Sequence, residues 1–201
     1  MAFNISQFRT NGLKKGGARP SLFEVDIFTP FSSVNSSRTS VLVQAASIPP
    51  ALIRSFPVYY FGRPIKLAGE RDFPDWEVEV LNDEDFALRK MFENWSNKIN
   101  ALVSNRQSED MLENGYKSTA IVRQFGQGNQ VIASYNFDGL WPSSIGPMRL
   151  NWQDGNSIQT YSVTFSYDWW EPGESDQTNE DDYSPVIAPD GVSSTYLTNR
   201  G

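Results

Sequence analysis

The sequence predicts a mainly β domain (α+β), an antiparallel β-barrel or sandwich of about eight strands with one flanking α-helix. Short segments of alternating apolar and polar residues, separated by glycine and proline, recur between residues 22 and 170. One segment, at about residues 84–104, has instead the apolar spacing of an amphipathic helix. A single helix with one apolar face must pack on a sheet, which excludes a helical bundle.

The strands follow from alternation and from turn residues. Prolines 49, 50 and 57 interrupt the backbone donors, so residues 48–57 are expected to form a loop or a sheet-edge segment. Strands are expected at residues 22–28, 40–47, 58–69 (two short strands around Gly62), 75–81, 117–125, 131–138, 140–152 with proline interruptions, and 157–170, the longest.

The helix is expected to begin after Asn82 or Asp83 as the cap, with Glu84 and Asp85 in its first turn, where the helix dipole favours negative charge. Its apolar stripe runs to Leu102. Four residues of the stripe are the expected core anchors beneath the sheet: Leu88, Phe92, Trp95 and Ile99.

The composition limits the possible chemistry. Aromatic residues make up 13% of the chain, so large rings should supply much of the core. The chain has no histidine and no cysteine, which excludes disulfides, thiolate or imidazole metal sites and histidine-based nucleophile systems. The first residues have no apolar signal region, and no segment is long and apolar enough to span a membrane, so a soluble protein without a cleaved signal is expected.

Charge divides the chain into three parts. Residues 1–20 hold four basic residues and no acid, and they are expected to form a basic N-terminal arm. Residues 21–170 are the expected β domain. Residues 171–201 hold seven acidic residues and one basic residue, and they are expected to form an acidic C-terminal extension. A basic arm and an acidic tail suit head-to-tail contacts between copies, although solvated termini also explain them.

Two sets of residues could carry chemistry. Glu24 with Asp26, and Glu77 with Glu79, are carboxylate pairs that could serve glycoside hydrolysis or a hard cation, although alternation on a strand also explains them. The side chains of Trp152, Trp169 and Trp170 could form a platform that binds sugars, although a role in the core or in subunit contacts is favoured for them. We therefore expect no catalytic residue, no metal site and no cofactor, and a carbohydrate-binding or glycoside-processing β domain is the alternative of another class.

The polar strand faces carry six acidic residues and one basic residue. DNA-binding proteins place lysine and arginine along the phosphates, so this surface argues against DNA binding. It suits a passage that must not hold DNA.

The stretch from Val41 to Ile99 resembles the tail tube proteins of contractile-tailed bacteriophages. The matching features, in order, are the strand ending Ala46-Ser47-Ile48-Pro49, the strand Tyr60-Phe61-Gly62-Arg63-Pro64-Ile65-Lys66, Ala68-Gly69-Glu70-Arg71, Trp76-Glu77-Val78, and Asn82-Asp83-Glu84 before a helix with Arg89, Phe92 and Trp95. The resemblance implies a β-barrel or sandwich whose copies form hexameric rings, stacked into a tube inside a contractile sheath. Related folds occur in the type VI secretion tube and in the protein that joins tube to baseplate.

The resemblance implies a structural, non-enzymatic virion protein that acts as the conduit for DNA ejection. Its partners would be its own copies, the tail sheath protein, the baseplate or tube initiator, the tail terminator and the tape measure protein, while DNA passes without specific binding and no membrane is involved. The resemblance also implies that the protein is assembled in the host cytoplasm and is located in the virion tail. A baseplate-proximal tube initiator or a secretion-type tube protein is the alternative within this class.

Two surfaces are expected to serve this function. The apolar segment 48–61 is too hydrophobic for an idle loop, so its residues Ile53, Phe56, Tyr59, Tyr60 and Phe61 are the expected subunit and ring-stacking interface. The expected lumen-lining residues are Glu77, Glu79, Ser162, Thr164 and Ser166.

Overall fold

A computed structural model describes residues 17–30, 40–109 and 115–173. Nine strands lie within these residues, together with the helix α3 and a helical turn that begins at Ser40. The strands are β1 (Phe23–Ile27), β2 (Val43–Ala46), β3 (Leu52–Tyr60), β4 (Arg63–Asp72), β5 (Trp76–Leu81), β6 (Ser118–Phe125), β7 (Val131–Ile145), β8 (Thr160–Ser166) and β9 (Trp169–Pro172). The predicted basic arm and acidic extension fall largely outside the described residues.

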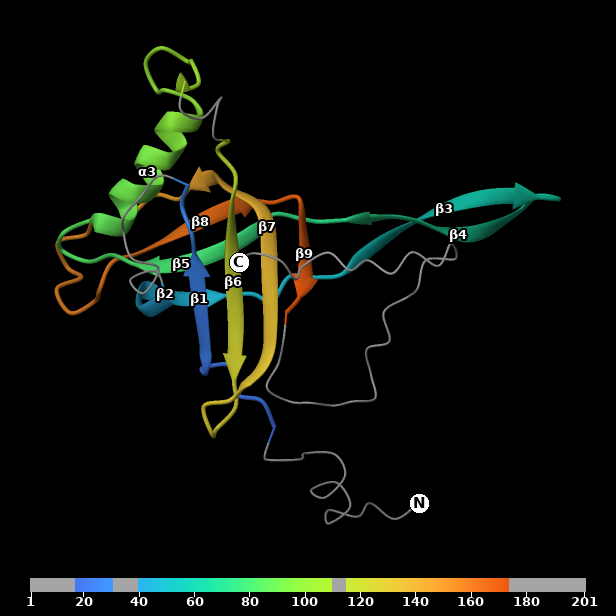
Figure 1. Cartoon of the computed structure of the whole chain (residues 1–201), viewed down its shortest axis with the longest axis horizontal. Helices are drawn as coiled ribbons and strands as arrows, with labels where there is room; N and C mark the ends of the chain where they lie inside the picture. Colours follow the sequence, from blue (N-terminus) through green and yellow to red (C-terminus); the bar gives the residue numbers. More distant parts are fainter. Residues whose placement is uncertain (1–16, 31–39, 110–114, 174–201) are drawn as a thin grey trace, which may run out of the picture.

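Seven strands form one bent antiparallel sheet in the order β1-β6-β7-β8-β5-β2, with β9 beside β7. The long central strand β7 pairs with β6 along its first part and with β8 along its last part (Figure 1). The sheet therefore has two halves that share β7: one contains β1, β6 and β9, and the other contains β8, β5 and β2. The two halves enclose the core in the manner of a β-sandwich and do not close into a barrel. The predicted mainly β, antiparallel class is confirmed.

The bend in β7 depends on Gly139. Its φ angle is +68°, which a side-chain-bearing residue rarely adopts. A Cβ atom placed there would lie 2.1 Å from an Asp168 carboxylate oxygen. The same aspartate ends β8, because its backbone N–H donates to the carbonyl of Asp138 and its carboxylate contacts Lys117 at 2.7 Å. The predicted single long strand 157–170 is therefore divided into β8 and β9.

Aromatic rings fill the core, as the composition predicted. Trp76 of β5 stacks on Phe137 of β7 with 4.4 Å between ring centroids, which joins the two halves of the sheet. Phe165 of β8 meets Phe92 of α3 at 5.7 Å. These four rings are almost fully buried, so each stabilises the fold by removing a large apolar area from water.

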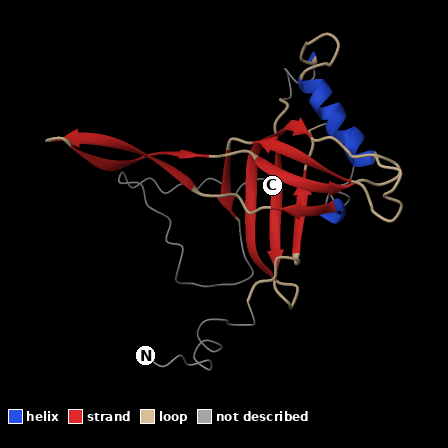
Figure 2. Cartoon of the chain, turned by 180° about the vertical axis from the view of Figure 1, so that it is seen from behind, coloured by secondary structure: helices blue, strands red, loops and turns tan. Residues whose placement is uncertain are grey.

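The helix α3 (Ala87–Ile99) covers one side of the core with Leu88, Phe92 and Trp95 buried and Ile99 partly buried. The indole N–H of Trp95 donates to the carbonyl of Tyr116 at 2.8 Å, which ties the helix to the segment before β6. The far end of the helix leads into a short loop that projects from the body (Figure 2).

The predicted helix limits of 84–104 are wrong. Phe86, with a φ angle of +55°, occupies the cap position, and neither Asn82 nor Asp83 caps the helix. Asp83 and Asp85 instead accept hydrogen bonds from the backbone of Glu84 and Ala87, so the acidic residues shape the approach to the helix and do not lie in its first turn. At the other end Asn100 is extended, and Leu102 lies outside the helix and is exposed.

The other two strands, β3 and β4, form a separate two-stranded hairpin that extends away from the body (Figures 1 and 2). The segment 48–57 is expected from its sequence to be either a loop or a sheet-edge strand. Its residues 52–57 belong to β3, so the sheet-edge alternative is correct for them. Pro57 is tolerated because a two-stranded ribbon leaves both outer backbone edges unpaired.

Candidate assembly surfaces

The β3–β4 hairpin has two different faces. Residues directly opposite each other in an antiparallel pair share a face, and their neighbours in sequence point to the other face. The pairs Phe56–Leu67 and Val58–Ile65 therefore form one apolar face, which Tyr60 continues toward the turn. The intervening pairs, Pro57–Lys66, Tyr59–Pro64 and Ser55–Ala68, form a mixed face.

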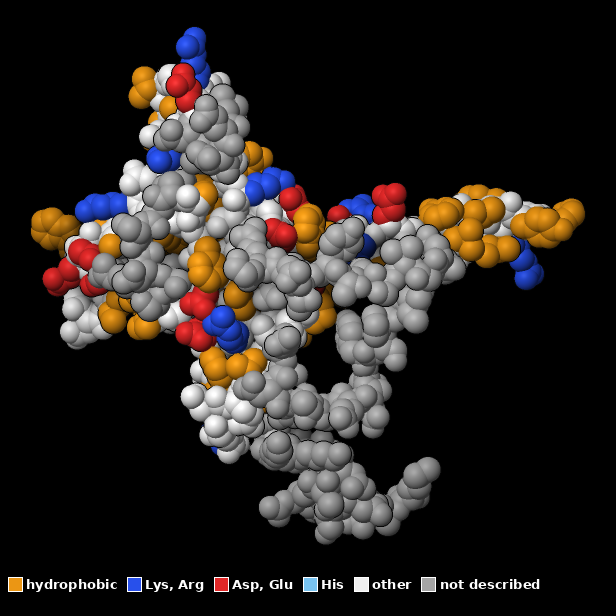
Figure 3. Space-filling view, viewed as in Figure 1, with side chains coloured by type: hydrophobic (Ala, Val, Ile, Leu, Met, Phe, Trp, Pro, Cys, Tyr) orange, Lys and Arg blue, Asp and Glu red, His pale blue; other side chains and the backbone are white. Residues whose placement is uncertain are grey.

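Every residue of β3 is exposed, and the hairpin ends in a tight turn at Phe61 and Gly62, both with positive φ. Phe61 is 90% exposed, with its ring edge against Tyr60 at 4.6 Å. Apolar side chains cover the distal hairpin in the space-filling view (Figure 3). A contiguous apolar patch of this kind is unusual on a monomeric protein and is typical of an interaction site.

The base of the hairpin is fixed to a defined geometry. The Arg54 guanidinium donates two hydrogen bonds to Asp72 across the pair, at 3.0 and 2.5 Å. The strand pairing shifts register between Ile53 and Ser55, and a Cβ atom on Gly69 would lie 2.9 Å from the Arg54 carbonyl oxygen. The bulge and the close approach twist the ribbon where it leaves the body.

All five residues predicted for the subunit interface lie on this hairpin, but they do not share one surface. Phe56 and Tyr60 lie on the apolar face, Tyr59 on the mixed face and Phe61 in the turn, while Ile53 lies near the base opposite Arg71. Sequence reasoning missed three members of the apolar face, Val58, Ile65 and Leu67. The alternation of Ile65 and Leu67 with Lys66 and Ala68 is the signal that indicates them.

The residues predicted to line the lumen gather on one face of the β5–β8 half. Glu77 pairs with Thr164, Glu79 pairs with Ser162, and Ser166 follows two residues along β8, so all five point away from the core. A hollow of about 620 Å³ is lined by three of them, Glu77, Glu79 and Ser162, and also by Ala45, Ser47 and Pro147. Within the described residues, neither glutamate forms an ion pair.

Some other acidic residues on or beside the strands have a basic partner. Arg123 on β6 contacts Asp26 at 2.5 Å and Glu24 at 3.5 Å on the outer face of the β1–β6 half. Lys117 contacts both oxygens of Asp168, and that hydrogen-bonded carboxylate raises the pKa of Lys117. Unlike these carboxylates, Glu77 and Glu79 have no ion-pair partner among the described residues.

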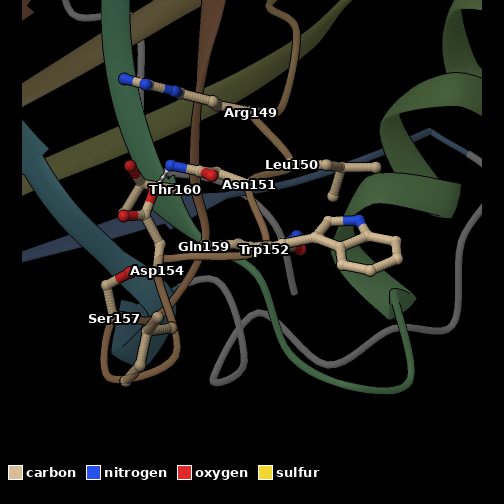
Figure 4. A pocket seen from close by; sticks show the side chains of 9 residues that line it. Arg149, Leu150, Asn151, Trp152, Asp154, Ser157, Gln159 and Thr160 are labelled. Carbon is tan, nitrogen blue, oxygen red and sulfur yellow. Dashed lines mark hydrogen bonds between the residues drawn. The ribbon is translucent and has the colours of Figure 1, made fainter.

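The residues of the carbohydrate alternative are not brought together. The pair Glu24 and Asp26 lies on a different half of the sheet from Glu77 and Glu79. Trp170 packs on Tyr135 at 5.7 Å, whereas Trp169 of the same strand is half exposed. Trp152 lies in the loop between β7 and β8, where its side chain points away from the polar residues of the neighbouring hollow (Figure 4). The tryptophans thus form no shared platform.

Within residues 17–30, 40–109 and 115–173, no group of three or more acidic side chains is placed to hold a metal ion. No helix in the same ranges is long and apolar enough to cross a membrane.

A family model described as phage tail tube protein matches residues 18–172 of the chain. This chain belongs to the phage tail tube protein family. Two tail tube proteins named gp19, from Enterobacteria phages T4 and T6, are each 33% identical to it over 159 residues, which cover 77% of this chain and 91% of the relative. The tail tube family gives the chain a structural function in a phage tail.

Solved structures of contractile injection systems share the tail tube fold. The chain matches a tube terminating cap structure of the anti-feeding prophage with a TM-score of 0.57, 14% identity and coverage of 78% of this chain and 91% of that one. A chain in the sheath–tube complex of the PVC extracellular contractile injection system matches with a TM-score of 0.54, 11% identity and coverage of 86% and 99%. At these identities the likeness shows the fold alone.

Proposed function

We propose that this protein forms the inner tube of a contractile phage tail, as hexameric rings stacked on one another, and that the tube conducts DNA into the host. The observation that carries the proposal is the protruding hairpin with an apolar face. Burying Phe56, Val58, Ile65 and Leu67 against another copy would remove that face from water, at about 25 cal/mol for each Å² of apolar area. A repeated contact of this kind supports a polymer.

The other partners follow from the tube. The sheath protein would surround it, and a tube initiator on the baseplate, a tail terminator and a tape measure protein would set its two ends and its length. The chain acts as a non-enzymatic structural component, assembled in the host cytoplasm and retained in the virion tail. The similar structures named as sheath–tube complex and terminating cap support these roles through their shared fold.

One alternative within the class is supported by a specific likeness. A chain in the anti-feeding prophage baseplate matches this chain with a TM-score of 0.55, 10% identity and coverage of 78% of this chain and 95% of that one, as good a match as the sheath–tube complex. A baseplate-proximal tube initiator would form a ring without extending it. Purified protein that forms single rings and never filaments would favour that function.

The interface proposal is tested by adding charge to the apolar face. We expect Phe56→Asp to prevent stacking, because an unpaired carboxylate buried in an apolar contact is strongly unfavourable. The domain should still fold, since the hairpin is separate from the core. Negative-stain electron microscopy, with circular dichroism as the folding control, gives the result.

A matched control is available on the other face. Tyr59→Asp changes an exposed aromatic residue of the mixed face, directly opposite Pro64. If stacking buries the apolar face alone, this variant forms tubes while Phe56→Asp does not. Normal tubes from Phe56→Asp would refute the assignment of the hairpin as the stacking interface.

A further inference from the structure

We propose that the apolar face of the hairpin docks on an acceptor surface at the opposite end of a neighbouring copy, formed by residues 82–86 and 149–158. This inference rests on the proposed function, because it names the place on the next copy that receives the hairpin. It also assigns a role to the loop between β7 and β8.

The two surfaces lie at opposite ends of the same part of the sheet. The chain leaves the hairpin at Asp72, enters β5 at Trp76 and reaches the acceptor surface after Leu81. The antiparallel partner β8 begins at that same end, where Asn82 hydrogen-bonds Gln159 through both its backbone and its side chain, at 2.8 and 3.1 Å. Figure 1 shows the hairpin and these loops on opposite sides of the body.

The acceptor surface is apolar where it is most exposed. Trp152 is fully exposed, and Leu150 and Ile158 are exposed by 81% and 70%. Leu150 and Trp152 point together toward the side where α3 lies, whereas Arg149 points the other way (Figure 4). A hollow of about 470 Å³ is lined by these residues together with Asp154 and the start of β8. The loop thus offers an apolar surface beside an open space.

The charges of the two surfaces are complementary. Between Ser55 and Gly69 the hairpin carries no acidic residue, and Arg63, directly opposite Tyr60, lies at the turn end of its apolar face. The acceptor surface carries four acidic residues and a single base, namely Asp83, Glu84, Asp85, Asp154 and Arg149. Acidic side chains lie at the end of the body opposite the hairpin in Figure 3. Complementary potentials favour the correct pairing and disfavour hairpin–hairpin or acceptor–acceptor contacts.

Because the two surfaces differ, each docked copy leaves its own hairpin or acceptor surface open for another copy. A heterologous contact of this kind repeats in one direction and gives the polymer a polarity. The stack would therefore have a hairpin end and an acceptor end.

Cysteine cross-linking tests the docking directly, since the chain has no native cysteine. We would mix a Val58→Cys protein with a Trp152→Cys protein, assemble them, oxidise the thiols and look for covalent dimers by gel electrophoresis. The matched control replaces Val58→Cys by Tyr59→Cys, which lies next in sequence but on the mixed face. Dimers from the first mixture and loss of most of that product in the control are expected.

A charge exchange gives an independent result. Lys66→Glu, on the mixed face, should leave assembly nearly unchanged. Arg63→Glu, on the apolar face, should raise the protein concentration needed for assembly by about threefold, the effect of an exposed charge pair. Adding Glu84→Lys and Asp154→Asn to that variant should recover most of the loss. An absence of recovery, together with an absence of Val58–Trp152 dimers in tubes that do form, would overturn the proposed docking but not the tube function. Wild-type protein that never stacks would overturn the tube function and the docking with it.

Discussion

At the residue scale, Gly139 is where a single Cβ atom would disturb the fold. Gly139→Ala should lower the free energy of unfolding by more than about 1 kcal/mol, because alanine is strained at a φ of +68° and because its Cβ would displace Asp168 from Lys117. Gly155→Ala is the matched control, since open space surrounds that position. Urea unfolding measures both, and equal stabilities of the two variants would contradict the assigned bend.

Tyr161 is a buried residue with a testable pH dependence. Its ring lies beneath the Arg89 guanidinium at 5.1 Å, and within the described part of the chain its hydroxyl has no hydrogen-bond partner. Burial raises the pKa of Tyr161 to about 12 from its ordinary value of 10. The folded state therefore holds this proton more tightly than the unfolded state does, so stability is retained below pH 10 and falls as the pH rises from 10 to 12.

Tyr161→Phe separates this effect from other alkaline effects. The variant should be at least as stable as the wild type at neutral pH, because it removes a buried hydroxyl without a partner. It should also lose less stability between pH 10 and 12, by about 2 kcal/mol at the upper end. Denaturant unfolding at several pH values gives the two curves, and parallel curves would mean that Tyr161 ionises as readily in the folded protein as in the unfolded chain.

At the scale of elements, α3 holds the core through Trp95. Trp95→Ala should reduce stability by about 3–5 kcal/mol through the cavity it leaves and the lost hydrogen bond to Tyr116. The thermal midpoint should fall by about 10 °C for a domain of this size. Trp152→Ala, which removes a fully exposed ring, is the control and should leave the midpoint nearly unchanged. Equal midpoints for the two variants would place α3 outside the core.

The existence of α3 and its buried face could be predicted, because Leu88, Phe92 and Trp95 keep the helical period. The helix limits could not be predicted, because a polar residue followed by acids is typical of a cap. In the structure Asp83 and Asp85 accept hydrogen bonds from the backbone N–H groups of Glu84 and Ala87, while Phe86 occupies the cap position. Leu102 continues the period by chance after the helix has ended at Ile99. Local pattern indicates the element, whereas backbone hydrogen bonds decide where it stops.

The hairpin was predicted only in part for a related reason. The turn at Gly62 could be predicted because glycine favours turns. Residues 52–57 contain Pro57 and do not alternate clearly, so which of their side chains share a face is known only from the pairing of β3 with β4. Pairing partners distant in sequence also explain Glu24 and Asp26, whose negative charge is partly balanced by Arg123 on a strand that the sequence alone does not place beside them.

At the scale of the whole molecule, the acidic face around Glu77 and Glu79 is proposed to line the channel. Duplex DNA carries about one negative charge per 1.7 Å, so a basic wall would hold it and an acidic or neutral wall would let it slide. Replacing both glutamates by lysine in protein that still assembles should slow or stall DNA ejection from intact particles at low salt. Normal ejection kinetics would place these residues away from the DNA path.

The two ends of the chain carry opposite net charges. The basic residues of 1–20 and the acidic residues of 171–201 are proposed to join neighbouring copies or to face the sheath, mainly through residues that lie outside the described ranges. Exposed ion pairs contribute roughly 0–1 kcal/mol each but repeat around every ring. Deleting residues 174–201 should therefore make assembly weaker or more sensitive to salt, as measured by sedimentation, and an unchanged sedimentation profile would make the extension dispensable for the tube.

Cryo-electron microscopy of the purified, polymerised protein tests the central claim most directly. We predict a tube of stacked six-subunit rings, with Glu77 and Glu79 on the inner wall and the apolar hairpin face buried against the next ring. A protein that remains monomeric at high concentration, or a polymer in which the hairpin stays exposed and the Glu77 face points outward, would contradict the account.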